Sequence, residues 1–108
     1  MPLKRDLFLG LVKLHILHHA GREPVYGAWL IEELRRHGYT LSPGTLYPML
    51  HGLETERLLS RERQIVEGRV RKIYRLTAAG REALARGRSQ VVELLREIDD
   101  NSDPRRAG

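Results

Sequence analysis

Six cationic side chains gather in one short segment of this 108-residue chain. Residues 58–76 carry a net charge of +4, out of +5 for the whole chain. The cations are Arg61, Arg63, Arg69, Arg71, Lys72 and Arg75, and the acids among them are Glu62 and Glu67. Affinity for a polyanion depends on the local field, so this segment indicates a phosphate-binding surface. The alternative reading is a solvated pair of strands that happens to be basic.

A second stretch suited to chemistry is SPGTLYPML, residues 42–50. Ser42 is a good helix N-cap, and Pro43 suits the first helical position, where the missing N–H has no partner to lose. Gly44 lets the backbone approach a ligand closely, and the hydroxyls of Ser42 and Thr45 can bind phosphates or bases. Free N–H groups at a helix start also attract phosphate. This stretch therefore predicts the start of a recognition helix in the major groove of DNA.

Tyr47 and His51 lie about one turn apart on this predicted helix, so we expect both side chains to point outward. The stripe that points inward is Leu46, Met49, Leu50 and Leu53. Thr45 and His51 are the side chains expected to face bases. The alternative is a stiff helix entry in which Tyr47 is half-buried packing.

Pro48 can be accommodated in two ways, which the residues leave open. If Ser42 caps the helix, Pro48 lies past the first turn and should bend the helix or loosen its start. If Thr45 caps it, Pro48 falls among the unpartnered donors and costs little.

Two helices are expected before this stretch. Residues 5–20 form the first, whose apolar side chains cover almost the whole circumference and leave Lys13 alone on the remaining side. One face should pack internally and the other against a second protomer. The second helix runs from about Tyr26 to His37, with Gly38 as its stop signal. Two short helices joined by a few residues are the helix-turn-helix pattern.

Residues 58–66 and 70–76 predict a β-hairpin, because β-branched and aromatic residues alternate there with charges around Gly68. Tyr74 and Leu76 are expected to complete the core. Thr77 should cap a last helix that runs to about Asp99 and carries a heptad-like apolar seam. The predicted fold is mainly α with a small β-hairpin, a winged helix-turn-helix plus a C-terminal dimerisation helix.

The segments VYGAWLIEEL, SPGTLYPMLHGLE and RKIYRLTAAG closely resemble the signature segments of the PadR-like transcriptional regulators, in the right order and spacing. The resemblance covers roughly residues 5–80. It implies a bacterial, homodimeric DNA-binding regulator, usually a repressor, whose first and terminal helices build the dimer interface. Some members bind aromatic ligands through aromatic side chains in the terminal helix. Residues 78–108 contain no Phe, Tyr or Trp, which argues against such a site here.

Composition excludes several other classes. A chain of this length with 41% hydrophobic residues can bury one compact core, and it contains no cysteine for disulfides or thiolate chemistry. No stretch is long and apolar enough to span a bilayer, so a soluble cytoplasmic protein is expected. No general acid/base pair or nucleophile stands out, which predicts neither an enzyme nor a cofactor.

Three histidines fall on one side of the first helix, and His15 and His19 have the i, i+4 spacing of a two-ligand metal site. No Cys or carboxylate in that helix completes such a site, so the prediction is no metal, with His15, His18 and His19 as ordinary interface or surface histidines. The alternative is a metal-sensing role in which a partner protomer completes the site of His15 and His19. Trp29 is similarly expected to be core or pocket wall.

The predicted function is a sequence-specific DNA-binding transcriptional regulator, a ligand-responsive repressor that acts as a homodimer on a palindromic operator. Its partners are double-stranded DNA, a second copy, and a small-molecule effector at or near the dimer interface. The alternative is a winged-helix protein-interaction subunit that binds an acidic partner.

Residues 1–76 are assigned to DNA binding, 77–99 to dimerisation and 100–108 to a disordered tail. The predicted DNA contacts are Ser42, Pro43, Gly44, Thr45, Tyr47, His51, Arg61, Arg63, Arg69, Arg71 and Lys72. The predicted interface residues are Leu7, Phe8, Leu11, Leu84, Val91, Leu94, Leu95 and Ile98.

Overall fold

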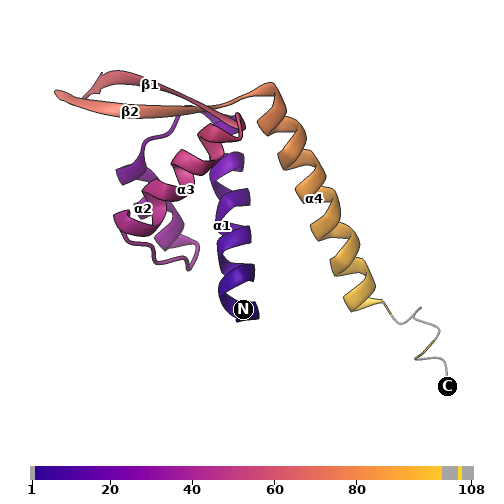
Figure 1. Cartoon of the computed structure of the whole chain (residues 1–108). Helices are drawn as coiled ribbons and strands as arrows, with labels where there is room; N and C mark the ends of the chain where they lie inside the picture. Colours follow the sequence, from indigo (N-terminus) through magenta and orange to yellow (C-terminus); the bar gives the residue numbers. More distant parts are fainter. Residues whose placement is uncertain (1, 101–104, 106–108) are drawn as a thin grey trace.

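The computed structural model describes residues 2–100 and 105, and it contains three helices, a two-stranded antiparallel hairpin and a long last helix. The bounds are α1 Leu3–Arg22, α2 Gly27–Arg36, α3 Pro43–Thr55, β1 Leu59–Val66, β2 Arg69–Leu76 and α4 Ala78–Asp99. Figure 1 shows α2 and α3 on one side of α1, the hairpin across one end, and α4 leaving on the other side. This arrangement confirms the predicted winged helix-turn-helix.

The core lies between the first three helices and the base of the hairpin. Each helix buries a stripe at helical spacing, as the sequence pattern predicts. The most deeply buried side chains are Val12, Ile16, Leu30, Leu34, Leu46, Leu50 and Leu59. Tyr74 is also buried in this core, and Leu76 and Trp29 are packed against it, which confirms their expected places.

The start of α3 settles the two alternatives for Pro48. The helix begins at Pro43 with Ser42 in the N-cap position and continues through Pro48 to Thr55. Since proline has no N–H, the carbonyl of Gly44 loses its usual helical donor. Gly44 is exposed, so solvent or a ligand can reach this part of the backbone.

The hairpin turns through Glu67 and Gly68, whose φ angles of 52° and 77° are those of a type I′ turn. The predicted positive φ at Gly68 is confirmed. The strands pair Arg63 with Lys72, so these two cations project from the same face of the hairpin. On its other edge β2 is bonded to Val25, which ties the hairpin to the segment that enters α2.

Thr77 fixes the junction between the hairpin and α4. Its hydroxyl accepts a hydrogen bond from the Gly80 N–H at 2.9 Å and donates to the Arg57 carbonyl at 2.6 Å, which confirms the predicted cap. A Cβ at Gly80 would lie 2.1 Å from the Leu58 carbonyl oxygen. The first turn of α4 therefore touches backbone at the base of the hairpin, and only glycine fits there.

None of the helices in the described part of the chain is long and apolar enough to cross a membrane. The predicted disordered tail falls, apart from Asp100 and Arg105, outside the described residues.

Candidate DNA interface

One face of α3 is free of the core. It carries Gly44, Tyr47, Pro48 and His51, all of them exposed. The His51 side chain is 78% exposed, and its Nδ1 lies 4.0 Å from a Glu54 carboxylate oxygen. The predicted outward direction of Tyr47 and His51 is thus confirmed. The imidazole of His51 is accessible to a binding partner.

Tyr47 is both exposed and packed. Its side chain is 42% exposed, yet its ring lies against the backbone of Gly27 at the start of α2. A Cβ at Gly27 would lie 2.5 Å from the phenolic oxygen of Tyr47 and 2.6 and 2.7 Å from two of its ring carbons. The absence of a side chain at Gly27 therefore lets the Tyr47 ring pack against the backbone, at the edge of the exposed face of α3.

Thr45 differs from its prediction as an exposed base reader, because it is half-buried and lies away from the Tyr47/His51 side of the helix. Its hydroxyl accepts a hydrogen bond from the Ser42 hydroxyl at 3.3 Å. Ser42 occupies the N-cap position, but its side chain makes no cap bond to the backbone. The Ser42 carbonyl takes the N–H groups of both Thr45 and Leu46, so the helix start is satisfied by backbone.

A hollow separates the free face of α3 from the hairpin. Its walls are supplied by the start of α2, the first half of α3 and the tip half of β2, namely Tyr26, Gly27, Tyr47, Val70, Arg71 and Lys72. Two of the predicted phosphate-binding cations therefore stand beside the predicted recognition helix.

Arg71 is held in this hollow by an aromatic ring. Its guanidinium carbon lies 4.9 Å from the centroid of the Tyr26 ring, a cation–π distance. Its Nε is buried and has no hydrogen-bond partner among the described residues. Lys72 and Arg69, its neighbours on β2, are exposed.

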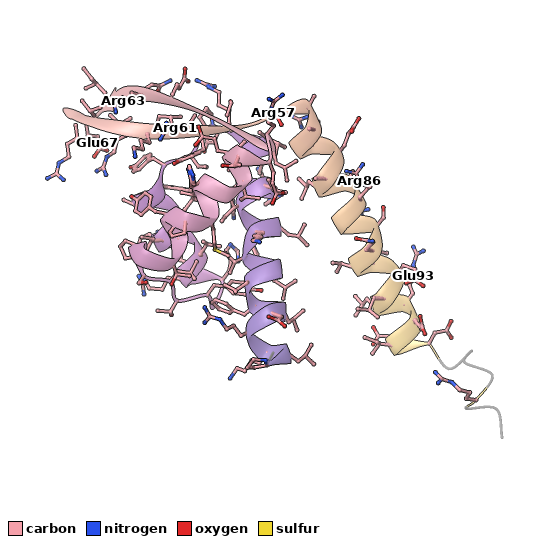
Figure 2. All side chains as sticks on the ribbon, in the orientation of Figure 1. Arg57, Arg61, Arg63, Glu67, Arg86 and Glu93 are labelled. Atoms are coloured by element: carbon pink, nitrogen blue, oxygen red, sulfur yellow. The ribbon has the colours of Figure 1, made fainter. Side chains whose placement is uncertain are left out.

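Two of the other hairpin arginines, Arg61 and Arg75, are paired with carboxylates. Figure 2 labels Arg61 and Arg63 on the hairpin. Arg75 donates to Glu62 at 2.7 Å, and this bond lowers the pKa of Glu62. Arg61 pairs with Glu54 of α3 at 3.4 Å, although Glu62 is its neighbour in sequence. The physical reason is the strand alternation, which turns Arg61 toward α3 and Glu62 to the opposite face. Arg63, also exposed, makes no ion pair within the described residues, so it is the freer of the two candidates.

The predicted interface residues fall into two groups. Phe8 packs against Tyr39 of its own chain, with ring centroids 5.3 Å apart, and Leu84 packs against its own core. Leu11 is half-buried. The other residues are largely uncovered, and they are Leu7, Val91, Leu94, Leu95 and Ile98.

The model of the Transcriptional regulator PadR-like family matches residues 16–86, which include the helix-turn-helix, the hairpin and the start of α4. The chain belongs to the PadR-like family of transcriptional regulators. As a PadR-like protein it is a DNA-binding regulator of transcription and not an enzyme.

Proteins described as transcriptional regulators are similar to this chain over most of its length. A protein described as transcriptional regulator Rv3488, from Mycobacterium tuberculosis, is 54% identical over 94 residues, covering 87% of this chain and 88% of that one. A PadR family regulator from Eggerthella lenta has 31% identity and a TM-score of 0.78, with 89% and 85% of the two chains covered. A PadR-like regulator from Bacillus cereus has 27% identity and a TM-score of 0.80, with coverage of 87% and 93%.

Three residues of this PadR-like interface were not expected from sequence reasoning: Tyr26, Gly27 and Glu54. Only Gly27 carried a signal, because a glycine in a helical pattern often marks a close approach. The partners of Tyr26 and Glu54 depend on how the hairpin crosses the helices.

Proposed function

We propose that this PadR-like regulator is a homodimeric repressor that reads a palindromic operator. Each protomer places α3 in a major groove, and the two grooves are about 34–36 Å apart along the duplex. The observation that carries the proposal is the hollow in which Tyr47 of α3 meets Arg71 and Lys72 of the wing. A base-reading helix and a phosphate-binding hairpin on one surface can engage one duplex together.

The two parts have different tasks in this proposal. His51 contacts base edges, while Tyr47 and the exposed backbone at Gly44 approach the groove wall. On the wing, Arg69, Arg71 and Lys72 bind phosphates or enter the minor groove, and Arg63 assists them. Ser42, Pro43 and Thr45 shape the helix start, and Arg61 contributes after it is released from Glu54.

Dimerisation brings the two reading surfaces into register. We assign residues 1–76 to DNA binding and 77–99 to dimerisation. The support is the outer half of α4, where Leu94 and Ile98 are 54% and 61% exposed. An apolar face of this size in a free monomer would be unfavourable, and a second copy of α4 together with α1 would cover it.

The proposal includes an effector that binds at or near the dimer interface. Such a ligand changes DNA affinity only if it favours one arrangement of the two reading surfaces over the other. The activity belongs to the bacterial cytoplasm, where the chromosome is accessible.

A salt titration tests DNA binding by this surface. Fluorescence anisotropy with the parent and Arg71→Ala/Lys72→Ala, over several salt concentrations, should show weaker binding and a log–log slope flatter by up to about 0.9 per lost phosphate contact. Arg86→Ala/Arg88→Ala on α4 removes the same charge from two exposed positions, and it should leave the slope unchanged. Equal slopes for the parent and the wing variant would refute the assignment.

The same anisotropy assay distinguishes DNA binding from the alternative function, a protein-interaction subunit that binds an acidic partner. A short duplex should compete for the protein far better than polyglutamate at equal charge concentration, since α3 fits a groove and the polypeptide offers none. Equal competition would favour a protein-interaction subunit.

A further inference from the structure

A group of metal-ligating side chains lies away from the DNA interface, where the end of α1 meets the end of α2. It consists of His19, Glu33 and His37, and one ligand atom of each lies within 4.8 Å of the others. His37 Nε2 is 3.3 Å from Glu33 Oε1, where Glu33 lies in the last turn of α2 and His37 is the residue that directly follows the helix. His19 comes from the last turn of α1.

His19 supplies a second, independent sign of a missing ligand. Its Nε2 is buried and has no hydrogen-bond partner among the described residues. A buried polar atom without a partner is unfavourable, and such atoms are rare in folded proteins. The His19 ring lies edge-on to Trp29, with centroids 5.5 Å apart, so packing restricts its orientation. The ring is therefore held with a nitrogen that no protein group satisfies.

Burial disfavours the charged form of two imidazoles in this region, those of His19 and His15. Burial lowers the pKa of His19, and the neighbouring His18 lowers it further, while Glu33 acts in the opposite direction. Burial also lowers the pKa of His15, whose ring centroid lies 5.2 Å from that of His37. Neutral imidazole is the form that binds metal ions.

We propose that His19, Glu33 and His37 bind one divalent transition-metal ion of the zinc class. Metal–ligand bonds of about 2.0–2.2 Å in a tetrahedron place ligand atoms roughly 3.3–3.5 Å apart, so the three side chains need to close only slightly. Two imidazole nitrogens and one carboxylate oxygen suit zinc, cobalt or nickel better than calcium or magnesium. Water takes the fourth position, and the His15 ring forms the adjacent wall.

The other charged neighbour of the site is compatible with this role. Arg36 lies 3.9 Å from Glu33 Oε2, on the carboxylate oxygen that does not face His37, and its side chain is mostly exposed. It can remain there or swing into solvent when the ion binds. Because His19 belongs to α1, Glu33 to α2 and His37 to the C-cap of α2, the ion cross-links the helix that supports the fold to the first helix of the helix-turn-helix.

The test uses the full chain without a histidine tag, stripped of metal with a chelator. Zinc chloride is titrated by calorimetry, and cobalt binding is followed by its visible d–d absorption. The variants His37→Gln and Glu33→Gln change exposed or half-buried side chains, and circular dichroism verifies their fold. The matched controls are His51→Gln, a histidine of the DNA interface, and Glu32→Gln, an exposed neighbour of Glu33.

We expect one zinc ion per chain, a tetrahedral cobalt spectrum and a higher melting temperature with zinc. Removal of a ligand should weaken zinc binding by about tenfold or more, whereas the two controls should stay within about threefold of the parent. The proposal is overturned if the parent does not bind zinc at millimolar concentration, or if both ligand variants bind it as the parent does.

Discussion

The guanidinium carbon of Arg71 lies 4.9 Å from the centroid of the Tyr26 ring, so a cation of the wing rests on the residue that precedes α2. The two residues are far apart in the sequence, and the packing of the hairpin against the segment before α2 brings them together. Under the proposed function, their contact orders the long arginine side chain before DNA arrives, which reduces the entropy lost on phosphate binding.

Replacing Tyr26 by leucine should therefore weaken DNA binding without changing the number of phosphate contacts. Leucine preserves apolar packing but removes the ring face, an interaction of about 0.5–1 kcal/mol, which corresponds to a two- to fivefold loss of affinity. Anisotropy titrations at several salt concentrations should show this loss with the parent's slope. A variant with parental affinity, or one whose slope falls as it does for Arg71→Ala, would contradict the role assigned to Tyr26.

His51 should control sequence preference more than affinity for DNA in general. Its side chain is 78% exposed on the free face of α3, and the proposal assigns it to base reading. His51→Ala should therefore reduce the free energy of binding to the preferred operator by roughly 1–3 kcal/mol. Binding to unrelated duplexes should change little. Selection from a random duplex library reports both effects, and an identical preferred site for variant and parent would show that His51 does not read bases.

Thr45 makes a useful comparison with His51. Because it is half-buried and bonded to Ser42, Thr45→Val should alter the helix start with less effect on the selected site than His51→Ala.

The helices and the hairpin were predictable because their signals are local. Gly38 and Gly68 adopt the positive φ expected of them, and Thr77 caps α4 through a residue three positions away. The first helix extends further than expected, from Leu3 to Arg22, because it begins directly after Pro2 and continues through Gly21 to end just before Pro24.

The candidate sites were less predictable because they join residues from different elements. The sequence pointed to His15 and His19 through their spacing, but Glu33 and His37 meet His19 only where α1 and α2 pack together. Ser42 similarly occupies its expected N-cap position, yet its hydroxyl donates a hydrogen bond to the Thr45 hydroxyl and makes no cap bond to the backbone. Such pairings depend on helix crossing and on competition among donors, which periodicity does not report.

Gly80 should be essential to the junction between the wing and α4. Its missing Cβ would lie 2.1 Å from the Leu58 carbonyl oxygen, and backbone on both sides cannot move cheaply. Gly80→Ala should reduce the free energy of unfolding by roughly 3 kcal/mol, at the upper end of overpacking costs. Urea denaturation followed by circular dichroism measures the change.

Gly87→Ala is the matched control on the same helix. A Cβ there would lie 2.6 Å from Leu14 Cδ2, and the next nearest atoms belong to the same flexible side chain. Alanine also adds helix propensity of up to about 1 kcal/mol. We expect it to be near neutral. If the two substitutions have equal effects, the close contact at Gly80 is not what fixes α4.

The proposed pairing of two DNA-reading surfaces depends on the outer half of α4. Changing Val91 and Leu94 together to aspartate would place two unpaired charges in the proposed contact, at a cost of several kcal/mol. The control Ala85→Asp/Ser89→Asp adds the same charge at exposed positions on another side of α4. It should leave the association intact.

Sedimentation equilibrium on these three proteins tests the central claim most directly. The account predicts that the parent and the Ala85→Asp/Ser89→Asp control sediment at twice the chain mass of 12.5 kDa at micromolar concentration. The Val91→Asp/Leu94→Asp variant should sediment as a monomer or unfold. A parent that remains monomeric at high micromolar concentration would contradict the account, because a single reading surface cannot recognise a palindromic operator as a dimer.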